Sequence, residues 1–285
     1  MDAVYLNGEF VAAEQARVSV FDQGLLYGDG IYESFRSVGR HLYQFDQHYR
    51  RLCQSAAALR YPPLVPQAEV ENILAELHQK NAITHGYFRL TITRGPGQIG
   101  FVRQRGAGLT WLIVGREFQG LDEQLYQTGI CLPVAQTRRN APEAISPKIK
   151  SISNLNSLLG KLEAQDQGAI EVIMLNNRQQ VCEGAASNIF WTRGNWVFTP
   201  DVSTGLLAGV TRATIMRLCE ERLKLRVVTG AYLMQDLKFS DEVFVTSTSL
   251  EVMPVTKVAG FTINQGQVGP IAKKLRAALH AEMGR

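Results

Sequence analysis

The chain has 285 residues, of which 45% are hydrophobic and 20% charged, so it is long enough for one large or two medium-sized globular domains. Its net charge of +4 is not gathered into a basic block, which argues against a nucleic-acid-binding surface and favours small-molecule chemistry. The four cysteines are widely spaced, and neither a signal-peptide pattern nor a run of about 18 apolar residues occurs, so we expect a cytoplasmic protein without a membrane segment or a metal site.

Short strands and helices alternate in the first third of the chain. Residues 4–10 are predicted to form a hairpin that turns at Asn7-Gly8. Residues 67–80 are predicted to form a helix, because their apolar residues recur at helical spacing. Residues 87–93 and 109–114 are predicted strands, joined by a glycine-rich loop.

Polar residues then interrupt the apolar pattern, which places a boundary between two subdomains here. We expect an N-terminal α/β subdomain over residues 1–116, a linker over 117–127 and a C-terminal subdomain over 128–285. Strands and helices are mixed on both sides, so the predicted fold class is α/β, of the α+β type.

The second half contains further alternating elements. A leucine stripe at helical spacing begins at Leu155, so Lys150 is expected where a strand ends and this helix begins. Residues 169–175 are a candidate buried strand, and residues 197–200 and 242–246 are predicted strands, the last running into a Thr/Ser loop.

Residues 211–223 are predicted to form a helix with Thr211 as its N-cap. The preceding segment, residues 205–212, brings a glycine turn to the start of that helix, where free amides can bind a phosphate. Hydroxyls of residues 246–249 and the guanidinium of Arg51 are further candidates for phosphate contacts.

Lys150 and Glu183 suggest amino-acid chemistry. A lysine amine can form a Schiff base with an aldehyde cofactor, and a carboxylate on the pyridine nitrogen keeps pyridoxal 5'-phosphate (PLP) protonated. Together with the phosphate candidates, these two residues supply the contacts that PLP requires.

Residues 95–100 match the dinucleotide-binding pattern GxGxxG, which needs its last glycine to open a helix. The segment from Phe101 to Leu109 lacks helical spacing, so we interpret the match as a loop.

The chain resembles the class IV aminotransferases, the fold type IV group of PLP enzymes, over nearly its whole length. The matching sequence motifs are Val18-Ser19-Val20-Phe21-Asp22-Gln23-Gly24 with Tyr27-Gly28-Asp29-Gly30, His48-x-x-Arg51-Leu52, Lys150-Ser151, Glu183-Gly184 with Ser187-Asn188, Gly209-Val210-Thr211-Arg212, and Thr248 with Glu251-Val252 and Pro254.

The resemblance implies that Lys150 is the Schiff-base lysine and acid/base, and that Glu183 pairs with the pyridine nitrogen. It implies PLP between two subdomains, the second of them PLP-binding, in a homodimer whose site borrows a loop from the neighbouring subunit. The phosphate contacts that it implies are Arg51, Thr211 with the amide of Val210, and Thr248.

The substrate is the open question. Tyr87-Phe88-Arg89 and the loop of residues 94–101 resemble branched-chain aminotransferases, whereas Tyr32 and Asn154 replace the Phe and Tyr usual there. Tyr32 is typical of D-amino acid aminotransferases, although the Arg and His of their carboxylate trap are replaced by Ile99 and Phe101. We therefore expect transfer between a branched-chain L- or a D-amino acid and a 2-oxo acid such as 2-oxoglutarate.

An aminodeoxychorismate lyase that releases pyruvate is the alternative, because Ser34 stands where those enzymes have Thr. A non-catalytic PLP-binding protein is disfavoured because both Lys150 and Glu183 are present. Arg36, Arg103 and Arg105 are further candidates for a carboxylate. The substrate contacts that we predict are Tyr32, Ser34, Tyr87, Arg89 and Ser249.

Overall fold

The structure is a computed structural model that describes residues 2–100 and 108–285. The expectations for Phe101, Arg103 and Arg105 therefore lie outside the described residues. The chain divides into two compact units, of which unit 1 comprises Met1–Gln119 with Lys148–Ser153, and unit 2 comprises Gly120–Pro147 with Asn154–Arg285.

Unit 1 is built on a six-stranded sheet in the order β2-β1-β6-β5-β3-β4, with every neighbouring pair antiparallel. The strands are β1 (Ala3–Leu6), β2 (Glu9–Ala12), β3 (Gly30–Val38), β4 (His41–Leu42), β5 (His85–Thr93) and β6 (Thr110–Glu117). Its helices are the 3-10 turn η1 (Ala13–Gln15), α1 (Gln23–Tyr27), α2 (Phe45–Ala58) and α3 (Gln67–Lys80).

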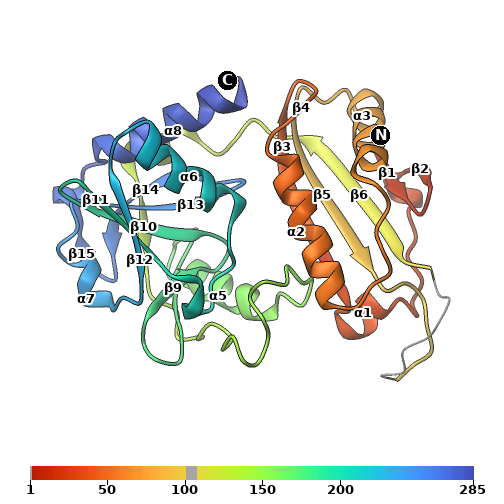
Figure 1. Cartoon of the computed structure of the whole chain (residues 1–285), viewed down its shortest axis with the longest axis horizontal. Coiled ribbons are helices and arrows are strands. Elements are labelled where there is room, and N and C mark those ends of the chain that lie inside the picture. The colour runs from red at the N-terminus through yellow and green to blue at the C-terminus, as the bar shows by residue number, and fades with distance from the viewer. Residues whose placement is uncertain (1, 101–107) are drawn as a thin grey trace. The chain divides into compact units, whose positions relative to one another are not determined.

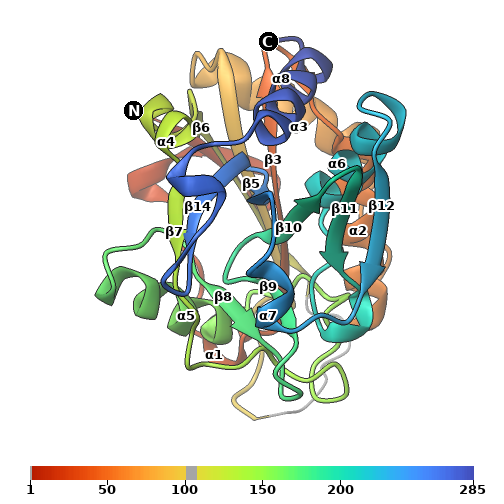
Figure 2. The same cartoon turned by 90° about the vertical axis from the view of Figure 1, so that its left-hand side faces the viewer.

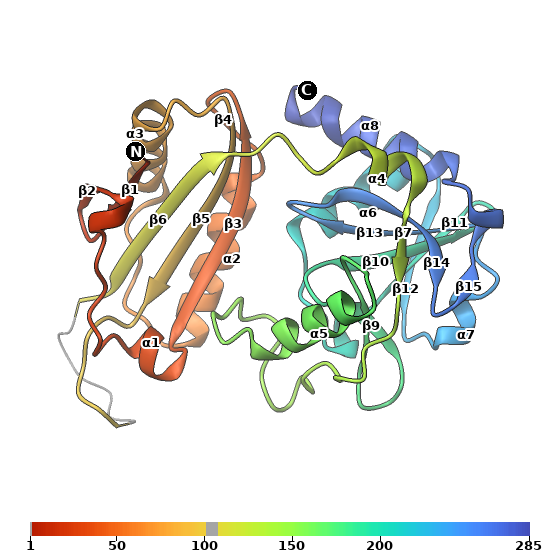
Figure 3. The same ribbon diagram turned by 180° about the vertical axis from the view of Figure 1, so that it is seen from behind.

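Helices α2 and α3 pack on one face of this sheet, as Figures 1 and 3 show from opposite sides. Phe35 of β3 and Phe88 of β5 lie in the core beneath the helices, with ring centroids 5.8 Å apart. Because side chains alternate along a strand, Tyr32 and Ser34 of β3 project from the opposite face, as does Arg89 of β5.

Unit 2 contains a sheet in the order β12-β11-β10-β13-β14-β15, with β7 paired to β14, and a separate two-stranded sheet of β8 and β9. Figure 2 shows these strands with the helices around them. The strands are β7 (Ile130–Leu132), β8 (Ile173–Leu175), β9 (Val181–Gly184), β10 (Asn188–Arg193), β11 (Trp196–Pro200), β12 (Arg226–Gly230), β13 (Glu242–Ser247), β14 (Glu251–Val258) and β15 (Phe261–Thr262). The helices are α4 (Glu123–Thr128), α5 (Leu155–Asp166), α6 (Val210–Glu221), α7 (Met234–Leu237) and α8 (Pro270–Met283), with 3-10 turns η2 (Val202–Thr204) and η3 (Asn264–Gly266).

The predicted α/β fold class is confirmed, and several predicted elements are found with small changes of boundary. The N-terminal hairpin turns at Asn7 and Gly8, which have the positive φ values of 51° and 101° that such a turn requires. Helix α3 has the predicted bounds, while the predicted strand at residues 169–175 shortens to β8. Among the described residues, no helix is both long and apolar enough to cross a bilayer.

Two local predictions are wrong. Lys150 follows no strand, because residues 133–150 form irregular structure and turns that the apolar pattern does not reveal. Helix α6 begins at Val210 with Gly209 as its N-cap, so Thr211 lies inside the first turn and does not cap it. The predicted linker at residues 117–127 contains the unit boundary after Gln119, but it also includes α4 except for its last residue. Residues 148–153 group with unit 1.

The packing of Phe88 on the backbone of Gly115 predicts a stability effect. A Cβ added at Gly115 would lie 2.4 Å from Cε1 of Phe88, whose ring is fully buried. We expect Gly115→Ala to lower the free energy of unfolding by about 1–3 kcal/mol, because the ring must leave its position in the core. Gly108→Ala, where the added Cβ meets nothing within 4 Å, is the control in urea denaturation; equal effects of the two variants would contradict this account.

Candidate active site

The polar face of the unit 1 sheet brings several predicted substrate residues together. Tyr32 and Arg89 meet on this face, where Cζ of Arg89 lies 3.8 Å from the centre of the Tyr32 ring. Nζ of Lys150 lies 4.5 Å from the centre of the same ring. The Tyr32 ring is therefore contacted by the guanidinium of Arg89, from β5, and by the amine of Lys150.

Lys150 is fixed by hydrogen bonds along its backbone. Its amide N–H donates to Oγ of Ser55 on α2, at 3.1 Å. Its carbonyl accepts from the amide of Tyr32 at 3.0 Å, and the amide of Ile152 donates to the carbonyl of Gly30 at 3.0 Å. Residues 150–152 thus extend along the start of β3, which holds the half-buried lysine beside Tyr32.

Arg51 is held on the helix side of the sheet by Glu33. Its Nε and Nη2 donate to the two carboxylate oxygens of Glu33 at 2.6 and 2.8 Å. Nδ1 of His48 lies 2.7 Å from the same carboxylate. This network uses one edge of the guanidinium, so the carboxylate sets the direction in which the rest of Arg51 points.

The charges of this network follow from burial and hydrogen bonding. Burial opposes ionisation of Glu33, but hydrogen bonds from Arg51 and His48 outweigh it and lower the pKa of Glu33 from 4.5 to about 2. Burial also lowers the pKa of His48, although the bond to Glu33 acts in the opposite direction. At neutral pH, Glu33 is therefore ionised and His48 neutral.

Glu183 of β9 is the centre of a second group of contacts, in unit 2. It is 4% exposed, and its Oε1 lies 2.7 Å from Nε of Arg139. Its Oε2 accepts from the amide of Leu207 at 3.1 Å and from Nδ2 of Asn188 at 3.2 Å. Arg139 and the two donors to Oε2 thus hold the carboxylate in one orientation, and a carboxylate can accept a hydrogen bond from the protonated nitrogen of a pyridine ring.

The amino-terminal end of α6 offers donors for an anion. The N-cap, Gly209, makes no side-chain hydrogen bond to the first amides of the helix. A Cβ on Gly209 would lie 2.2 Å from Oδ1 of Asn188, so only glycine fits between this strand and the helix. Val210 and Thr211 follow directly and present the positive end of the helix dipole.

The turn between β13 and β14 carries Thr248 and Ser249, both half-buried. Oγ of Ser247 accepts from the amide of Leu250 at 3.0 Å and lies 3.4 Å from Oγ of Ser249. The next residue, Glu251, has a positive φ of 54°. Its buried carboxylate is bound by three side chains of the C-terminal segment, Arg276, His280 and Arg285.

These residues fit PLP by the chemistry of their donors. Within unit 1, Lys150 has the primary amine that a PLP aldehyde requires. Within unit 2, Glu183 is a buried carboxylate paired with Arg139, and the start of α6 has amides without a side-chain cap. In addition, Oγ1 of Thr246, which is buried opposite Asn188 in the sheet, has no hydrogen-bond partner among the described residues.

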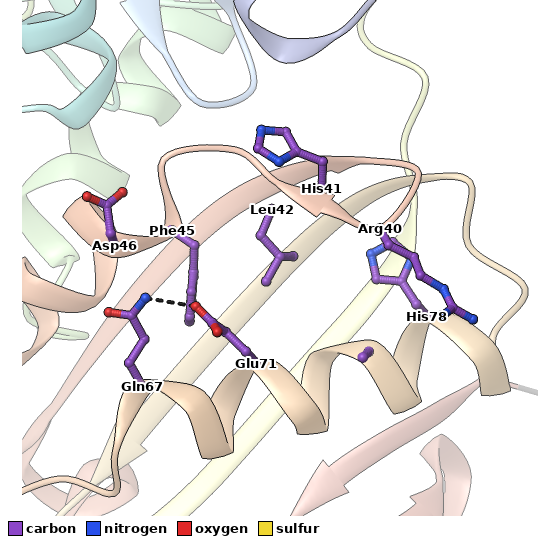
Figure 4. Close-up of a pocket in the computed structure, with 9 residues that line it drawn as sticks. Arg40, His41, Leu42, Phe45, Asp46, Gln67, Glu71 and His78 are labelled. Atoms are coloured by element: carbon purple, nitrogen blue, oxygen red, sulfur yellow. Dashed lines mark hydrogen bonds between the residues drawn. The ribbon is translucent and has the colours of Figure 1, made fainter.

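The cavity drawn in Figure 4 is a different feature. It measures about 380 Å³, lies between β4 and α3 in unit 1 and contains none of the predicted site residues. Its lining residues are Arg40, His41, Leu42, Phe45, Asp46, Gln67, Glu71, Ala75 and His78.

The sequence did not reveal the partners of the predicted residues. Arg139 and Glu33 belong to no motif that points to a role, and each pairs with a residue that is distant in the chain. Asn188 could be found, because it belongs to one of the words that resemble the aminotransferases. Among the described residues there is no group of three metal ligands.

Comparison with known proteins identifies the family. The model of amino-transferase class IV matches residues 30–258. A putative branched-chain-amino-acid aminotransferase of Methanocaldococcus jannaschii is 34% identical over 273 residues, which cover 96% of this chain and 93% of the relative. D-alanine aminotransferase of Bacillus licheniformis is 34% identical over 277 residues, covering 97% and 95%. The crystal structure of the Escherichia coli branched-chain amino acid aminotransferase superposes with a TM-score of 0.94 at 29% identity, covering 98% and 94%.

The buried Glu33 network predicts a pH dependence of stability. The folded-state pKa of Glu33 is the lower one, so the unfolded chain takes up the proton first, and the free energy of unfolding falls as the pH drops from about 4.5 to about 2. Glu33→Gln should remove this slope and cost on the order of 3 kcal/mol at neutral pH.

Urea denaturation followed by circular dichroism at a series of pH values measures both effects. Glu282→Gln removes a partly exposed carboxylate that pairs with Arg217 and is the control. If wild type and Glu33→Gln lose stability in parallel through that pH range, Glu33 is not the group that titrates.

Proposed function

Because the chain belongs to the class IV aminotransferase family, we propose that it transfers the amino group of a branched-chain L-amino acid to a 2-oxo acid such as 2-oxoglutarate, with PLP as cofactor. The proposal rests mainly on two groups that the fold holds in place. They are the amine of Lys150 beside the Tyr32 ring in unit 1 and the carboxylate of Glu183 paired with Arg139 in unit 2. The family identified from the sequence is confirmed by the match over residues 30–258.

Lys150 is assigned the proton transfers. When bound, PLP supplies an aldehyde that links to amines and a ring that accepts electrons. Nζ of Lys150 would link to the aldehyde at rest and then, once freed by the substrate amine, take the proton from the substrate Cα and return it. The backbone hydrogen bonds to Ser55 and Tyr32 hold the lysine in place for both steps.

Glu183 is assigned to the pyridine nitrogen. An ionised carboxylate there favours the protonated ring, and Arg139 together with the amide of Leu207 fixes its charge and orientation. Removal of Arg139 would leave a buried carboxylate with one fewer partner, so the ionised form would be less favoured.

The phosphate is assigned to groups that are each suited to an anion. The uncapped start of α6 supplies the amide of Val210 and the hydroxyl of Thr211. The half-buried Thr248 supplies a further hydroxyl, and Arg51, oriented by Glu33, supplies a cation.

The substrate carboxylate is assigned to Arg89 and Tyr87, which share the polar face of the unit 1 sheet with Tyr32 and Ser34. A guanidinium stacked on an aromatic ring keeps its N–H edge available for a carboxylate. Ser249 is assigned to the substrate as a hydroxyl in the turn after β13. The choice of a branched-chain substrate is supported by the Tyr87-Phe88-Arg89 motif and by relatives that are named branched-chain aminotransferases.

The chain is proposed to form a homodimer through apolar surfaces. Helix α5 exposes a leucine stripe in which Leu155 is 67% and Leu158 is 53% exposed, and Leu159 and Leu162 are 43% and 46% exposed. Helix α1 exposes Leu25 to 67%. A stripe of exposed leucines such as that of α5 is typical of a face that another chain covers.

A half-reaction tests the proposed activity. The PLP form of the purified enzyme, mixed with L-leucine, L-glutamate, D-alanine or D-glutamate one at a time, should lose the absorbance of the lysine-bound cofactor with the L-series only. Lys150→Ala should lack this absorbance from the start, because no lysine amine can link to the aldehyde. It should also convert PLP to pyridoxamine 5'-phosphate about 100-fold or more slowly than wild type, because the proton acceptor is lost. Conversion by D-alanine or D-glutamate alone would show that the substrate is a D-amino acid. No conversion by any of the four amino acids would favour an aminodeoxychorismate lyase.

The oligomeric state tests the second part of the proposal. Light scattering after gel filtration should give wild type a mass twice the 31.7 kDa of one chain. Leu158→Glu with Leu162→Glu should shift the protein to the monomer, because charges would be buried at the interface. Lys273→Glu on α8 reverses an exposed charge elsewhere and should leave the dimer intact. A dimer that survives the double substitution would show that α5 is not the interface.

A further inference from the structure

Glu171 is a fully buried carboxylate that the proposed chemistry does not use. It lies just before β8, has 0% exposure, and both of its oxygens accept hydrogen bonds. Oε1 accepts from the amides of Val172 at 3.0 Å and Ala185 at 2.9 Å. Oε2 accepts from Ser187 Oγ at 3.0 Å and from the amide of Ala186 at 3.3 Å.

Three of these donors belong to the turn that joins β9 to β10. The turn closes with a hydrogen bond of 2.6 Å from the amide of Gly184 to the carbonyl of Ser187. A Cβ on Gly184 would lie 3.0 Å from Cδ of Glu171 and 2.2 Å from Oγ of Ser187, so the turn is packed directly on the carboxylate. Glu171 therefore determines the path of the backbone between Glu183 and Asn188.

The charge of Glu171 is balanced within the same unit. Nζ of Lys161 on α5 lies 3.0 Å from Oε2 of Glu171 and donates to the carbonyl of Ile170 at 2.7 Å. Helix α5 also approaches the turn closely at Gly160, where an added Cβ would lie 3.3 Å from Cβ of Ala185. The turn is thus held from two sides, by the carboxylate and by the helix that carries its counter-charge.

Both residues that the turn connects belong to the pyridine-nitrogen site. Glu183 ends one side of the turn and Asn188 begins the other, and Asn188 donates back to Glu183 at 3.2 Å. A shift of the turn would change both ends of this contact together. Arg139 and Leu207 come from other segments, so they would no longer meet Glu183 in the same geometry.

We infer that Glu171 is a positioning residue, which fixes the turn of residues 184–187 so that the carboxylate of Glu183 is aimed at the pyridine nitrogen of the cofactor. The inference rests on the proposed function, because it takes Glu183 as the partner of the ring nitrogen. It adds a residue that would touch neither cofactor nor substrate and would act through the backbone of the turn.

Glu171→Gln tests the role of the carboxylate with little change of shape. All of the groups that face Glu171 are donors or can donate, and glutamine replaces one accepting oxygen by an NH₂ group. Whichever way the amide is turned, at least two donors face its nitrogen, so the turn must shift.

The readout is the preference for PLP over 1-deaza-PLP, the analogue in which CH replaces the ring nitrogen. The ratio of the dissociation constant of 1-deaza-PLP to that of PLP, measured by fluorescence titration of the apoprotein, reports the contact of Glu183 with the ring nitrogen. General loosening of the site weakens both ligands and leaves the ratio unchanged. We expect Glu171→Gln to reduce this ratio about tenfold, which corresponds to a loss of about 1.4 kcal/mol in the preference for PLP. Glu183→Gln, which changes the proposed partner of the ring nitrogen itself, should change the ratio in the same direction.

Glu242→Gln is the matched control. Glu242 is 5% exposed and accepts from the amides of Ile271 and Ala272 at the start of α8, at 2.8 and 2.9 Å. The same substitution there should lower the melting temperature and leave the ratio as in wild type. A ratio in Glu171→Gln equal to that of Glu242→Gln would overturn the inference.

Two further comparisons keep the outcome decisive. If Glu171→Gln does not fold, Ser187→Ala removes one contact to Oε2 and should reduce the ratio less, with an unchanged ratio counting against the inference. Wild type that binds no PLP would defeat the proposed function itself, and this is established before any variant is compared. Wild type that prefers PLP while Glu171→Gln keeps the full preference defeats only the inference.

Discussion

A carboxylate that leaves water must find donors and counter-charge inside the protein, and this constraint organises the residues around the site. Glu33 is met by Arg51 and His48, and Glu183 by Arg139. Glu171 and Glu251 are bound in the same manner, each next to a turn that carries or connects predicted site residues. A buried charge with several partners tolerates few alternative arrangements, so each one fixes the neighbouring backbone as well as itself.

Features with a local cause could be predicted from the sequence. The bounds of α3 follow from its apolar spacing, and the first hairpin follows from Asn7-Gly8, because both depend on residues that are near neighbours in the chain. The alternation of β3 likewise places Tyr32 and Ser34 on one face without reference to any other segment. The sequence motifs shared with the family singled out Lys150 and Glu183 from the other lysines and glutamates, which no local rule could do.

What the sequence could not provide were contacts between distant segments. Glu33 and Arg51 come from different elements, and Arg139 precedes Glu183 by 44 residues. In neither pair does the sequence around one residue indicate that the other is its partner. The irregular backbone before Lys150 escaped prediction for a related reason. Amides of this segment donate to carbonyls of β8 and to the carboxylate of Glu163 on α5, so its conformation depends on those elements and not on its own pattern of side chains.

The position of Tyr32 limits what its identity says about the substrate. Arg89 lies over the face of the ring, and Lys150 lies on the ring as well, so both contacts use the aromatic system that Phe and Tyr share. A choice between Tyr and Phe would leave this stacking in place and change only what the para position can donate or accept. The hydroxyl of Tyr32 can therefore influence the handedness of the substrate only by a direct contact with it. The guanidinium of Arg89, which stacks on the ring, can bind the carboxylate of an L- or a D-amino acid. In the proposed function, selection between L- and D-amino acids depends on the side from which Cα is presented to the amine of Lys150, which a single residue of this sheet face does not determine.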